Sequence, residues 1–287
     1  MMQSEQEGQR NLQQSGAAGQ RNTQYATNIK KRSMRRKKAR RMRRIKRIFV
    51  AAIILLVVFA ASRTSFVQGF LNYWNVKSEA TLTAEGYPES LVQLYEKNEE
   101  ARQFVLDYKK NGNNEQPIDI SSDVTDGKIP LFLQWDERWG YRTYGDNFLA
   151  ITGCGPTALS MVYVGLTGDT SMNPYAVAQM AQEDGFYVNG SGSSWSMMTE
   201  LATKLGLSAQ ELSLNEDSIR QELSQGHPII CIMGPGDFTT SGHFVVLTGV
   251  DSEGKITVND SNSKKNSNKA WKIEDLKSQI RDLWVYQ

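Results

Sequence analysis

The chain has 287 residues, enough for one or two domains, and its 39% hydrophobic and 22% charged residues suit a globular protein with polar additions. The formal net charge of +2 averages two opposite parts: residues 1–47 contain 15 Lys or Arg and two Asp or Glu, whereas residues 48–287 contain 18 and 29. Only two cysteines are present, which excludes a disulfide framework.

The first part of the chain contains two polar segments. Residues 1–29 are rich in Gln, Asn, Ser and Gly without apolar periodicity, so we expect them to be disordered. Residues 30–47 contain 13 Lys or Arg and no acidic residue, a run that could by itself bind nucleic acid. An uncharged apolar segment follows directly and favours a membrane role instead. We therefore interpret residues 1–47 as a disordered basic cytoplasmic tail that contacts lipid, and we predict no nucleic-acid partner.

The apolar segment is a candidate membrane anchor. Residues 48–61 carry no charge, and flanking residues that reach the headgroups extend the segment, so we predict a transmembrane signal-anchor at residues 48–63. The Lys and Arg excess before it predicts a cytoplasmic N-terminus and an exterior location for the chain after Arg63. The alternative is a cleaved signal peptide, for which a basic leader of about 47 residues is unusually long.

Residues 64–128 are interpreted as an extracytoplasmic linker with a helical preface. Between Ser90 and Tyr108, apolar residues recur at spacings of three and four with charged residues between them, which predicts an amphipathic helix. Residues 111–128 contain Gly, Asn, Asp and Ser, which is typical of a spacer.

Residues 129–287 have the pattern of a globular domain. A strand is predicted at residues 129–134. Helices follow in the first half, over residues 157–166, from Asn173, after residue 194 and over residues 218–225. Strands predominate in the second half, at residues 228–233, 243–250, 255–259 and 283–286. A helical half followed by a β-rich half predicts an α+β fold.

Cys154 is a candidate nucleophile. It lies between two glycines and precedes Pro156 and an apolar run with helical spacing. Because proline is favoured in the first turn of a helix, we place Cys154 at or just before a helix N-terminus, where the helix dipole favours a thiolate. The alternative is a structural cysteine at a turn. The second cysteine, Cys231, lies in an apolar run and is interpreted as core, although a disulfide between the two stays open.

A cysteine nucleophile needs a base, and two histidines are present. His227 is interpreted as a solvated turn residue. His243 follows a glycine-rich loop and begins a predicted strand, a common position for catalytic groups, although it could merely cap the strand. A hairpin turn centred near residue 252 would place Asp260 beside His243, where a carboxylate fixes the tautomer of the imidazole. Asn259 would face the other side of the sheet.

Gln134 is a candidate oxyanion donor, because its amide carries two N–H groups and no charge. A polar residue at the end of a strand is an equally good interpretation. Two histidines and two scattered cysteines give no metal-ligand spacing, and the glycine-serine stretch at residues 190–193 lacks the lysine of a P-loop. We therefore predict no metal and no cofactor.

These residues resemble the papain-like cysteine peptidases related to bacteriocin-processing, double-glycine leader peptidases, and in particular a stand-alone bacterial branch. Several separate stretches within residues 85–287 carry the similarity: Tyr87–Leu91, Ile129–Leu131, Gln134–Asp136, Trp139-Gly140, Gly153–Thr157, Gly236–Thr239, Gly242–Phe244 and Val258–Ser263. The resemblance implies a papain-like fold with Cys154 as nucleophile, His243 as base, Asp260 as orienting residue and Gln134 as oxyanion donor. In the transporter-linked members the glutamine lies close before the cysteine, whereas Gln134 lies 20 residues upstream.

We therefore expect a membrane-anchored, extracytoplasmic cysteine peptidase that cleaves a peptide or protein substrate. Because the 287 residues contain no transporter domains, a leader-peptide substrate is not implied. Four aromatic residues are candidates for the substrate pocket: Tyr144, Phe186, Trp195 and Phe238. The alternatives are a catalytically silent, surface-anchored binding or scaffolding domain of the same fold, and a nucleic-acid-associated protein that uses the basic tail.

Overall fold

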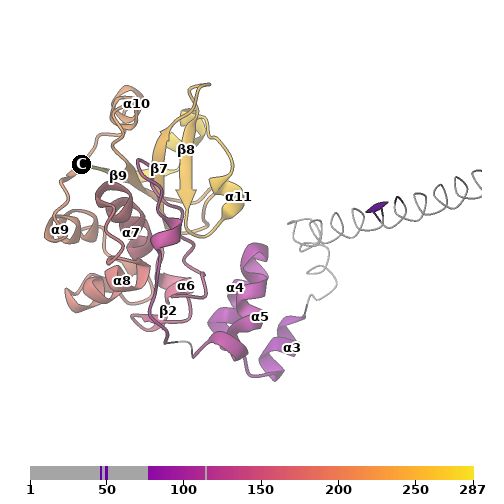
Figure 1. The fold of residues 1–287 in the computed structure, drawn as a ribbon. Helices are drawn as coiled ribbons and strands as arrows, with labels where there is room; N and C mark the ends of the chain where they lie inside the picture. The colour runs from indigo at the N-terminus through magenta and orange to yellow at the C-terminus, as the bar shows by residue number, and fades with distance from the viewer. Residues whose placement is uncertain (1–45, 47–48, 51–76, 114) are drawn as a thin grey trace, which may run out of the picture. The chain divides into compact units, whose positions relative to one another are not determined.

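The computed structural model describes residues 46, 49–50, 77–113 and 115–287. The chain divides into two compact units, residues 1–76 and 77–287, and all elements discussed below belong to the second (Figure 1). The predicted tail and signal-anchor lie, apart from residues 46, 49 and 50, outside the described residues. Among the residues that are described, no helix is both long and apolar enough to cross a membrane.

The second unit begins with a preface of three short helices, α3 (Glu79–Ala84), α4 (Glu89–Lys97) and α5 (Arg102–Asn111). The single helix predicted from Ser90 to Tyr108 is wrong, because the chain breaks at Asn98. The Asn98 backbone is extended, with φ −128° and ψ 99°, and its side chain accepts the N–H of Glu100 at 3.0 Å. A residue that caps a new turn in this way competes with continuation of the preceding helix.

The preface helices are packed onto the rest of the unit. Their apolar faces form one buried cluster with Trp135, Tyr141 and Ala150. Within this cluster the rings of Phe104 and Tyr141 stack at a centroid distance of 4.1 Å, and the Tyr141 hydroxyl donates to the carbonyl of Phe104 at 2.6 Å. Burial of such side chains contributes about 1.5–3 kcal/mol each, so α3–α5 are an integral part of this core.

Helix α7 (Cys154–Thr167) lies at the centre of the helical half, and its residues from 155 to 162 are all buried. A helix that is mostly apolar on all sides, like this one, is stable only inside a core. Its neighbours are α6 (Leu149–Thr152), α8 (Pro174–Glu183), α9 (Met197–Lys204) and two small hairpins, β1 (Thr143–Tyr144) with β2 (Asn147–Phe148) and β3 (Tyr187–Val188) with β4 (Gly192–Ser193). Helix α7 ends at Gly168, whose φ of 70° is left-handed and favours glycine. Helix α8 begins after Asn173, as predicted.

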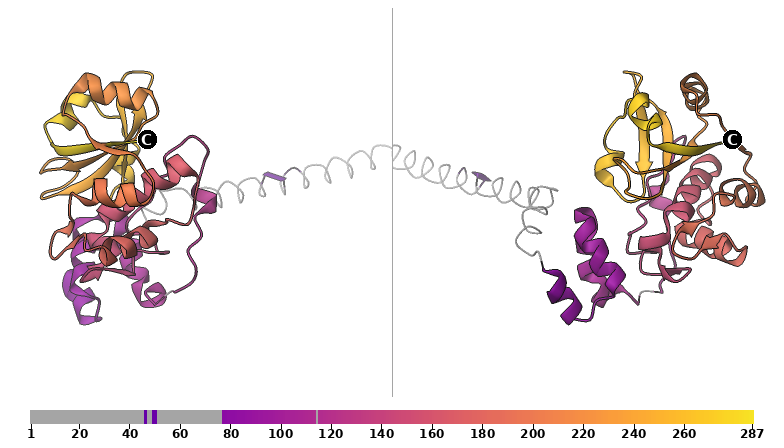
Figure 2. Two further views of the ribbon diagram at one scale, coloured as in Figure 1. Left: turned by 90° about the vertical axis from the view of Figure 1, so that its left-hand side faces the viewer. Right: turned by 180° about the vertical axis from the view of Figure 1, so that it is seen from behind.

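The second half forms a five-stranded antiparallel sheet of order β5-β9-β6-β7-β8. Its strands are β5 (Ala209–Glu211), β6 (Ile229–Met233), β7 (His243–Val250), β8 (Ile256–Asp260) and β9 (Ile280–Tyr286). One face packs in the same buried cluster as α7, and the other packs in a second cluster with α10 (Glu216–Ser224) and α12 (Ile273–Lys277). The sheet and the helices around α7 form separate layers (Figures 1 and 2). The predicted α+β class is confirmed.

The strand predicted at residues 129–134 is wrong. Pro130 has no backbone N–H to contribute to a ladder, and the segment is held instead by side-chain bonds to β8. The amide of Asn259 donates to the carbonyls of Ile129 and Pro130 at 3.1 and 2.9 Å. The backbone N–H of Gln134 donates to the carbonyl of Ser261 at 2.8 Å. These contacts bring Gln134 to the end of β8.

Candidate active site

Cys154 is the first residue of α7 and lies where α6 meets it. The intervening Gly153 donates its N–H to the carbonyl of Leu149 at 2.8 Å, and a Cβ on Gly153 would lie 2.5 Å from that oxygen. Only glycine therefore fits this junction. Since Cys154 is the first helical residue, its backbone N–H has no acceptor within α7 and can serve a bound group. The predicted position of Cys154 at a helix N-terminus is confirmed.

The second glycine of the motif, Gly155, lets a hairpin approach the start of the same helix. A Cβ on Gly155 would lie 2.6 Å from Ser193 Oγ in β4. Ser193 Oγ is in turn hydrogen-bonded to the buried hydroxyl of Tyr144 at 2.8 Å. The β3–β4 hairpin is thus held against Cys154, whose side chain is partly buried.

His243 and Asp260 come from adjacent strands and are joined by a hydrogen bond. His243 Nε2 lies 2.7 Å from Asp260 Oδ1, and their side chains are 7% and 1% exposed. The strand register pairs Asp260 with Val245, so His243 lies two residues along β7 on the same face. The predicted proximity of His243 and Asp260 is confirmed, and Asn259 faces the other side, where it binds the segment that precedes Gln134.

Two further residues hold the Asp260 carboxylate, and a third holds its backbone. Asn266 Nδ2 donates to Oδ2 at 2.8 Å, and the backbone N–H of Asn262 donates to Oδ1 at 2.8 Å. The backbone N–H of Asp260 donates to Ser267 Oγ at 2.9 Å. Asn266 and Ser267 belong to the short helix α11 (Lys264–Ser267). Burial raises the pKa of Asp260, but these donors and His243 outweigh it and lower the pKa, so that Asp260 stays ionised.

Burial likewise opposes the charged forms of Cys154 and His243, but hydrogen bonds and neighbouring charges outweigh it. The thiol of Cys154 and the imidazole of His243 interact, and each is a cause of the other's pKa shift. Together with the backbone N–H groups of Phe244 and Gly155, the interaction with His243 lowers the pKa of the thiol. The bonds of His243 to Asp260 and Cys154 raise the pKa of the imidazole. Both directions favour a thiolate paired with an imidazolium near neutral pH.

Gln134 is buried beside this group but outside the cleft that contains Cys154. Its Nε2 donates to the carbonyl of Ala150 in α6 at 2.7 Å, and its Oε1 accepts from Ser261 Oγ at 3.1 Å. The amide is therefore fixed between the helix that precedes Cys154 and the loop that follows Asp260. One of its two N–H groups binds Ala150, and the role of the other as an oxyanion donor stays a prediction.

The helical preface supports the loop that follows Asp260. Asn98 Nδ2 donates to the carbonyl and to Oδ1 of Asn262, at 2.8 and 2.9 Å. The carboxylate of Glu100 accepts from Ser263 Oγ at 2.6 Å and from the backbone N–H of Lys264 at 2.9 Å. This loop therefore derives part of its geometry from residues more than 150 positions earlier in the chain.

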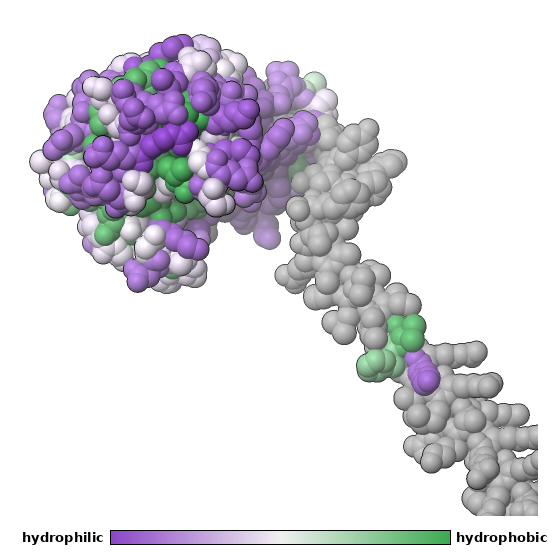
Figure 3. All heavy atoms as spheres, turned by 90° about the horizontal axis from the view of Figure 1, so that it is seen from above, coloured by the Kyte–Doolittle hydropathy of each residue, from purple (hydrophilic) through white to green (hydrophobic). Residues whose placement is uncertain are grey.

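A cleft of about 560 Å³ contains Cys154. Its walls are the β2–α6 segment, the β3–β4 hairpin, the end of β6 with the loop that follows it, and Arg281 of β9. Of the four aromatic residues predicted for a pocket, Trp195 lines this cleft, whereas Tyr144, Phe186 and Phe238 do not. The rest of the lining is mostly glycine, serine and other small or polar residues. The face of the domain seen in Figure 3 is mostly hydrophilic, with smaller hydrophobic patches.

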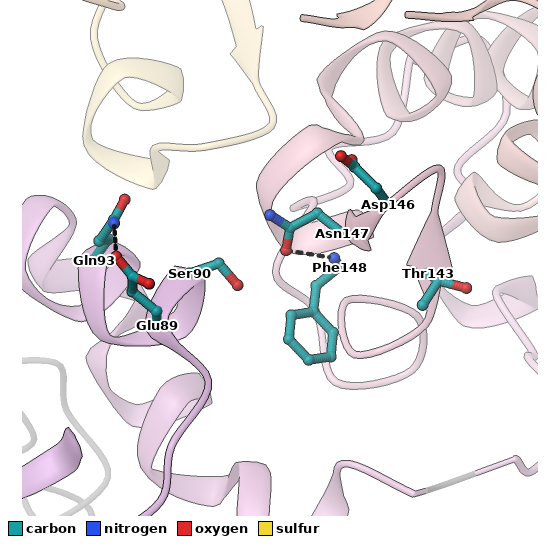
Figure 4. Close-up of a pocket in the computed structure, with 7 residues that line it drawn as sticks. All are labelled: Glu89, Ser90, Gln93, Thr143, Asp146, Asn147 and Phe148. Atoms are coloured by element: carbon teal, nitrogen blue, oxygen red, sulfur yellow. Dashed lines mark hydrogen bonds between the residues drawn. The ribbon is translucent and has the colours of Figure 1, made fainter. Parts of the chain in front are cut away.

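A second hollow, of about 550 Å³, adjoins this cleft, because Asp146 and Asn147 line both. Figure 4 shows Ser90 and its neighbours on α4 on one side and the β1–β2 hairpin on the other. The side chains on the α4 side are Glu89, Ser90 and Gln93, and no Lys or Arg lines this hollow. The preface thus forms one wall of a depression next to the Cys154 cleft.

The other candidate residues lie apart from this group. Cys231 is a buried, free thiol in β6, and burial raises its pKa, so it is core as predicted. Cys154 is also free, and the alternative of a disulfide between the two is not realised. His227 is only partly exposed and its Nδ1 lies 2.7 Å from Glu222 Oε2, which corrects its interpretation as a solvated turn residue. Within residues 77–113 and 115–287, no group of three or more His, Cys, Asp or Glu could hold a metal ion.

Comparison with known proteins gives a family match over the domain that holds these residues. A model described as the Peptidase_C39 like family matches residues 127–287, a range that includes Gln134, Cys154, His243 and Asp260. A similar solved structure is the peptidase domain of Streptococcus ComA, a bi-functional ABC transporter involved in a quorum sensing pathway. The two are 20% identical, with 47% of this chain and 89% of that chain covered and a TM-score of 0.36. No curated protein matches. Helices α3–α5 precede the range that the family model matches.

Proposed function

The chain belongs to the Peptidase_C39 like family, and on that premise we propose that it is a cysteine peptidase in which Cys154 is the nucleophile. The observation that carries the proposal is the buried 2.7 Å bond between His243 and Asp260, which lies beside a Cys154 thiol whose pKa His243 lowers. A nucleophile, a base and a group that orients the base are the parts that acyl transfer requires.

In the proposed mechanism, the Cys154 thiolate attacks the carbonyl carbon of the substrate peptide bond. The negative charge that develops on the carbonyl oxygen is stabilised by the backbone N–H of Cys154 and by the Gln134 side chain. The His243 imidazolium gives its proton to the leaving amine, and an acyl-enzyme remains. His243 then accepts a proton from water, whose oxygen attacks the thioester carbonyl and releases the acid and the thiolate. Asp260 stabilises the imidazolium throughout.

The rate at which iodoacetamide alkylates Cys154 tests the activated nucleophile. Because the lowered pKa keeps the thiol ionised, Cys154 is expected to react faster than a free thiol such as glutathione at about pH 6, where an ordinary thiol with a pKa near 8.5 is protonated. Mass spectrometry assigns the modified cysteine, and the buried Cys231 is the internal control. A Cys154 rate no higher than that of glutathione would contradict the proposal.

We further propose that the peptidase domain is held outside the cell membrane by a signal-anchor at residues 48–63. The support is the sequence, in which a run of 13 Lys or Arg precedes an uncharged apolar segment. The full chain, expressed in bacterial cells, is expected to stay in the membrane fraction after alkaline carbonate extraction. Protease added to intact spheroplasts is expected to degrade residues 77–287. Release by carbonate, or protection from protease, would contradict this placement.

A further inference from the structure

Arg281 occupies an irregular position in β9, next to the candidate active site. The pairing of β6 with β9 matches Ile232 with Asp282 and Met233 with Ile280, so Arg281 is an extra residue between two paired positions. An extra residue of this kind is a β-bulge, which redirects the side chain it carries. Arg281 is exposed and lines the cleft that contains Cys154.

The chain leaves room for the guanidinium of Arg281 by having glycine at residue 234. A Cβ on Gly234 would collide with Arg281 Nε, so the side chain lies directly over this glycine. Gly234 does not have a positive φ, and its backbone conformation is open to other residues. Its N–H donates to the carbonyl of Gln279 at 2.7 Å, which fixes the junction between β6 and the segment before β9. A side chain at residue 234 would therefore take the space that the Arg281 guanidinium occupies.

The guanidinium of Arg281 has no acidic partner among residues 77–113 and 115–287. The cleft residues include one acid, Asp146, which accepts a hydrogen bond from the Tyr187 hydroxyl instead. Among the described residues that line the cleft, Arg281 is the one cation. A guanidinium without an acidic partner, in the same cleft as Cys154, presents several N–H donors in a planar fork that matches a carboxylate.

We propose that Arg281 binds a carboxylate of the peptide substrate, either an Asp or Glu side chain close to the scissile bond or the C-terminal carboxylate of a short peptide. This proposal rests on the proposed peptidase function. It adds a substrate class to that function, because a paired guanidinium and carboxylate form two charge-assisted hydrogen bonds that a neutral amide does not reproduce. Arg281 is then a specificity-determining residue rather than part of the bond-breaking group.

Matched peptides test the proposal in the full-length chain. Internally quenched peptides that the wild type cleaves are made in pairs with Glu or Gln at each position near the scissile bond, and with a free or an amidated C-terminus. In one pair, we expect the peptide with the carboxylate to be cleaved with a kcat/KM about tenfold higher than its neutral partner. A preference in a Glu/Gln pair identifies a side-chain carboxylate, and a preference in a free/amidated pair identifies the C-terminal carboxylate. Arg281→Gln is expected to abolish this preference, whereas Lys272→Gln, which removes an exposed charge outside the cleft, is expected to keep it. Equal preference in Arg281→Gln and wild type would overturn the proposal.

Two further measurements keep this result interpretable. Gly234→Ala keeps the charge but displaces the guanidinium, so the same preference is expected to fall. Alkylation of Cys154 by iodoacetate and by iodoacetamide compares an anion with a neutral reagent of the same shape and needs no peptide cleavage. Arg281→Gln is expected to lower the ratio of the two rates about threefold, and Lys272→Gln to leave it unchanged. If the wild type cleaves no peptide, the peptidase proposal fails. The alkylation ratio still tests the anion site in that case, and an unchanged ratio in Arg281→Gln would reject it.

Discussion

Replacing Asp260 with asparagine removes one buried charge while keeping nearly the same shape. The two carboxylate oxygens of Asp260 are bonded to His243 at 2.7 Å and to Asn262 N–H and Asn266 Nδ2 at 2.8 Å. Each of these contacts needs an acceptor, whereas an asparagine side chain supplies one oxygen and one NH₂ group. At least one of these three donors therefore loses its partner in Asp260→Asn.

The size of the expected change in the pKa of His243 follows from its charged hydrogen bond to Asp260. Such a bond contributes about 1.5–3 kcal/mol, and one pKa unit corresponds to about 1.4 kcal/mol. The pKa of His243 is therefore expected to fall by about one to two units in Asp260→Asn. The imidazole then stabilises the thiolate less, so the pKa of Cys154 rises. The pH range in which thiolate and imidazolium coexist narrows from both sides, because its acidic limit moves up and its alkaline limit moves down.

The assay is the rate of Cys154 alkylation by iodoacetamide between about pH 4 and about pH 10. On the acidic limb of the profile, where the thiol is mostly protonated in both proteins, a rise of one to two units in the pKa of Cys154 is expected to slow Asp260→Asn about 10–100-fold relative to the wild type. Asp251→Asn, in the turn between β7 and β8, removes a charge from the same hairpin and is expected to keep the wild-type profile. A folded Asp260→Asn variant with an unchanged pH profile would refute the reasoning.

Two further predictions concern the support of the site. Asn98→Ala removes the two bonds to Asn262, at 2.8 and 2.9 Å, and the capping bond to the Glu100 N–H. We expect the free energy of unfolding to fall by about 1–2 kcal/mol and kcat/KM to fall with it. The control variant Gln103→Ala, on the exposed surface of α5, is expected to change neither quantity. Urea unfolding and peptide hydrolysis measure both, and equal behaviour of the two variants would contradict the supporting role. Gly155→Ala places a Cβ 2.6 Å from Ser193 Oγ, so we expect the free energy of unfolding to fall by about 1–3 kcal/mol and the Tm to fall with it. An unchanged Tm would contradict this prediction and show that β4 can move away from α7.

The central parts of the site were predictable because their signals are local. Pro156 and the apolar run after Cys154 mark a helix start, and the structure begins α7 at Cys154. The short turn between β7 and β8 fixes their register, so counting from the turn places Asp260 near His243 to within about one residue. The bulge between Leu247 and Gly249 did not disturb this result, because Asp260 stayed on the same face of the hairpin as His243.

The features that the sequence did not reveal depend on contacts between distant segments. The extended backbone at Asn98 ends α4, although the apolar pattern of the sequence continues across this residue. Two hydrogen bonds from the Asn98 side chain to Asn262 stabilise the break. The segment at residues 129–134 has the apolar pattern of a strand, but the side chain of Asn259 replaces the ladder. The bulge at Arg281 exists only in the pairing of β6 with β9, which no local pattern specifies.

The most direct test of the central claim is peptide hydrolysis by the purified full-length chain. A diverse peptide library is incubated with the wild type and with Cys154→Ala, and new termini are identified by mass spectrometry. The account predicts defined cleavage sites for the wild type and none of them for Cys154→Ala, because removal of the nucleophile leaves no group to form the acyl-enzyme. An absence of cleavage by the wild type, or the same cleavage by Cys154→Ala, would contradict it.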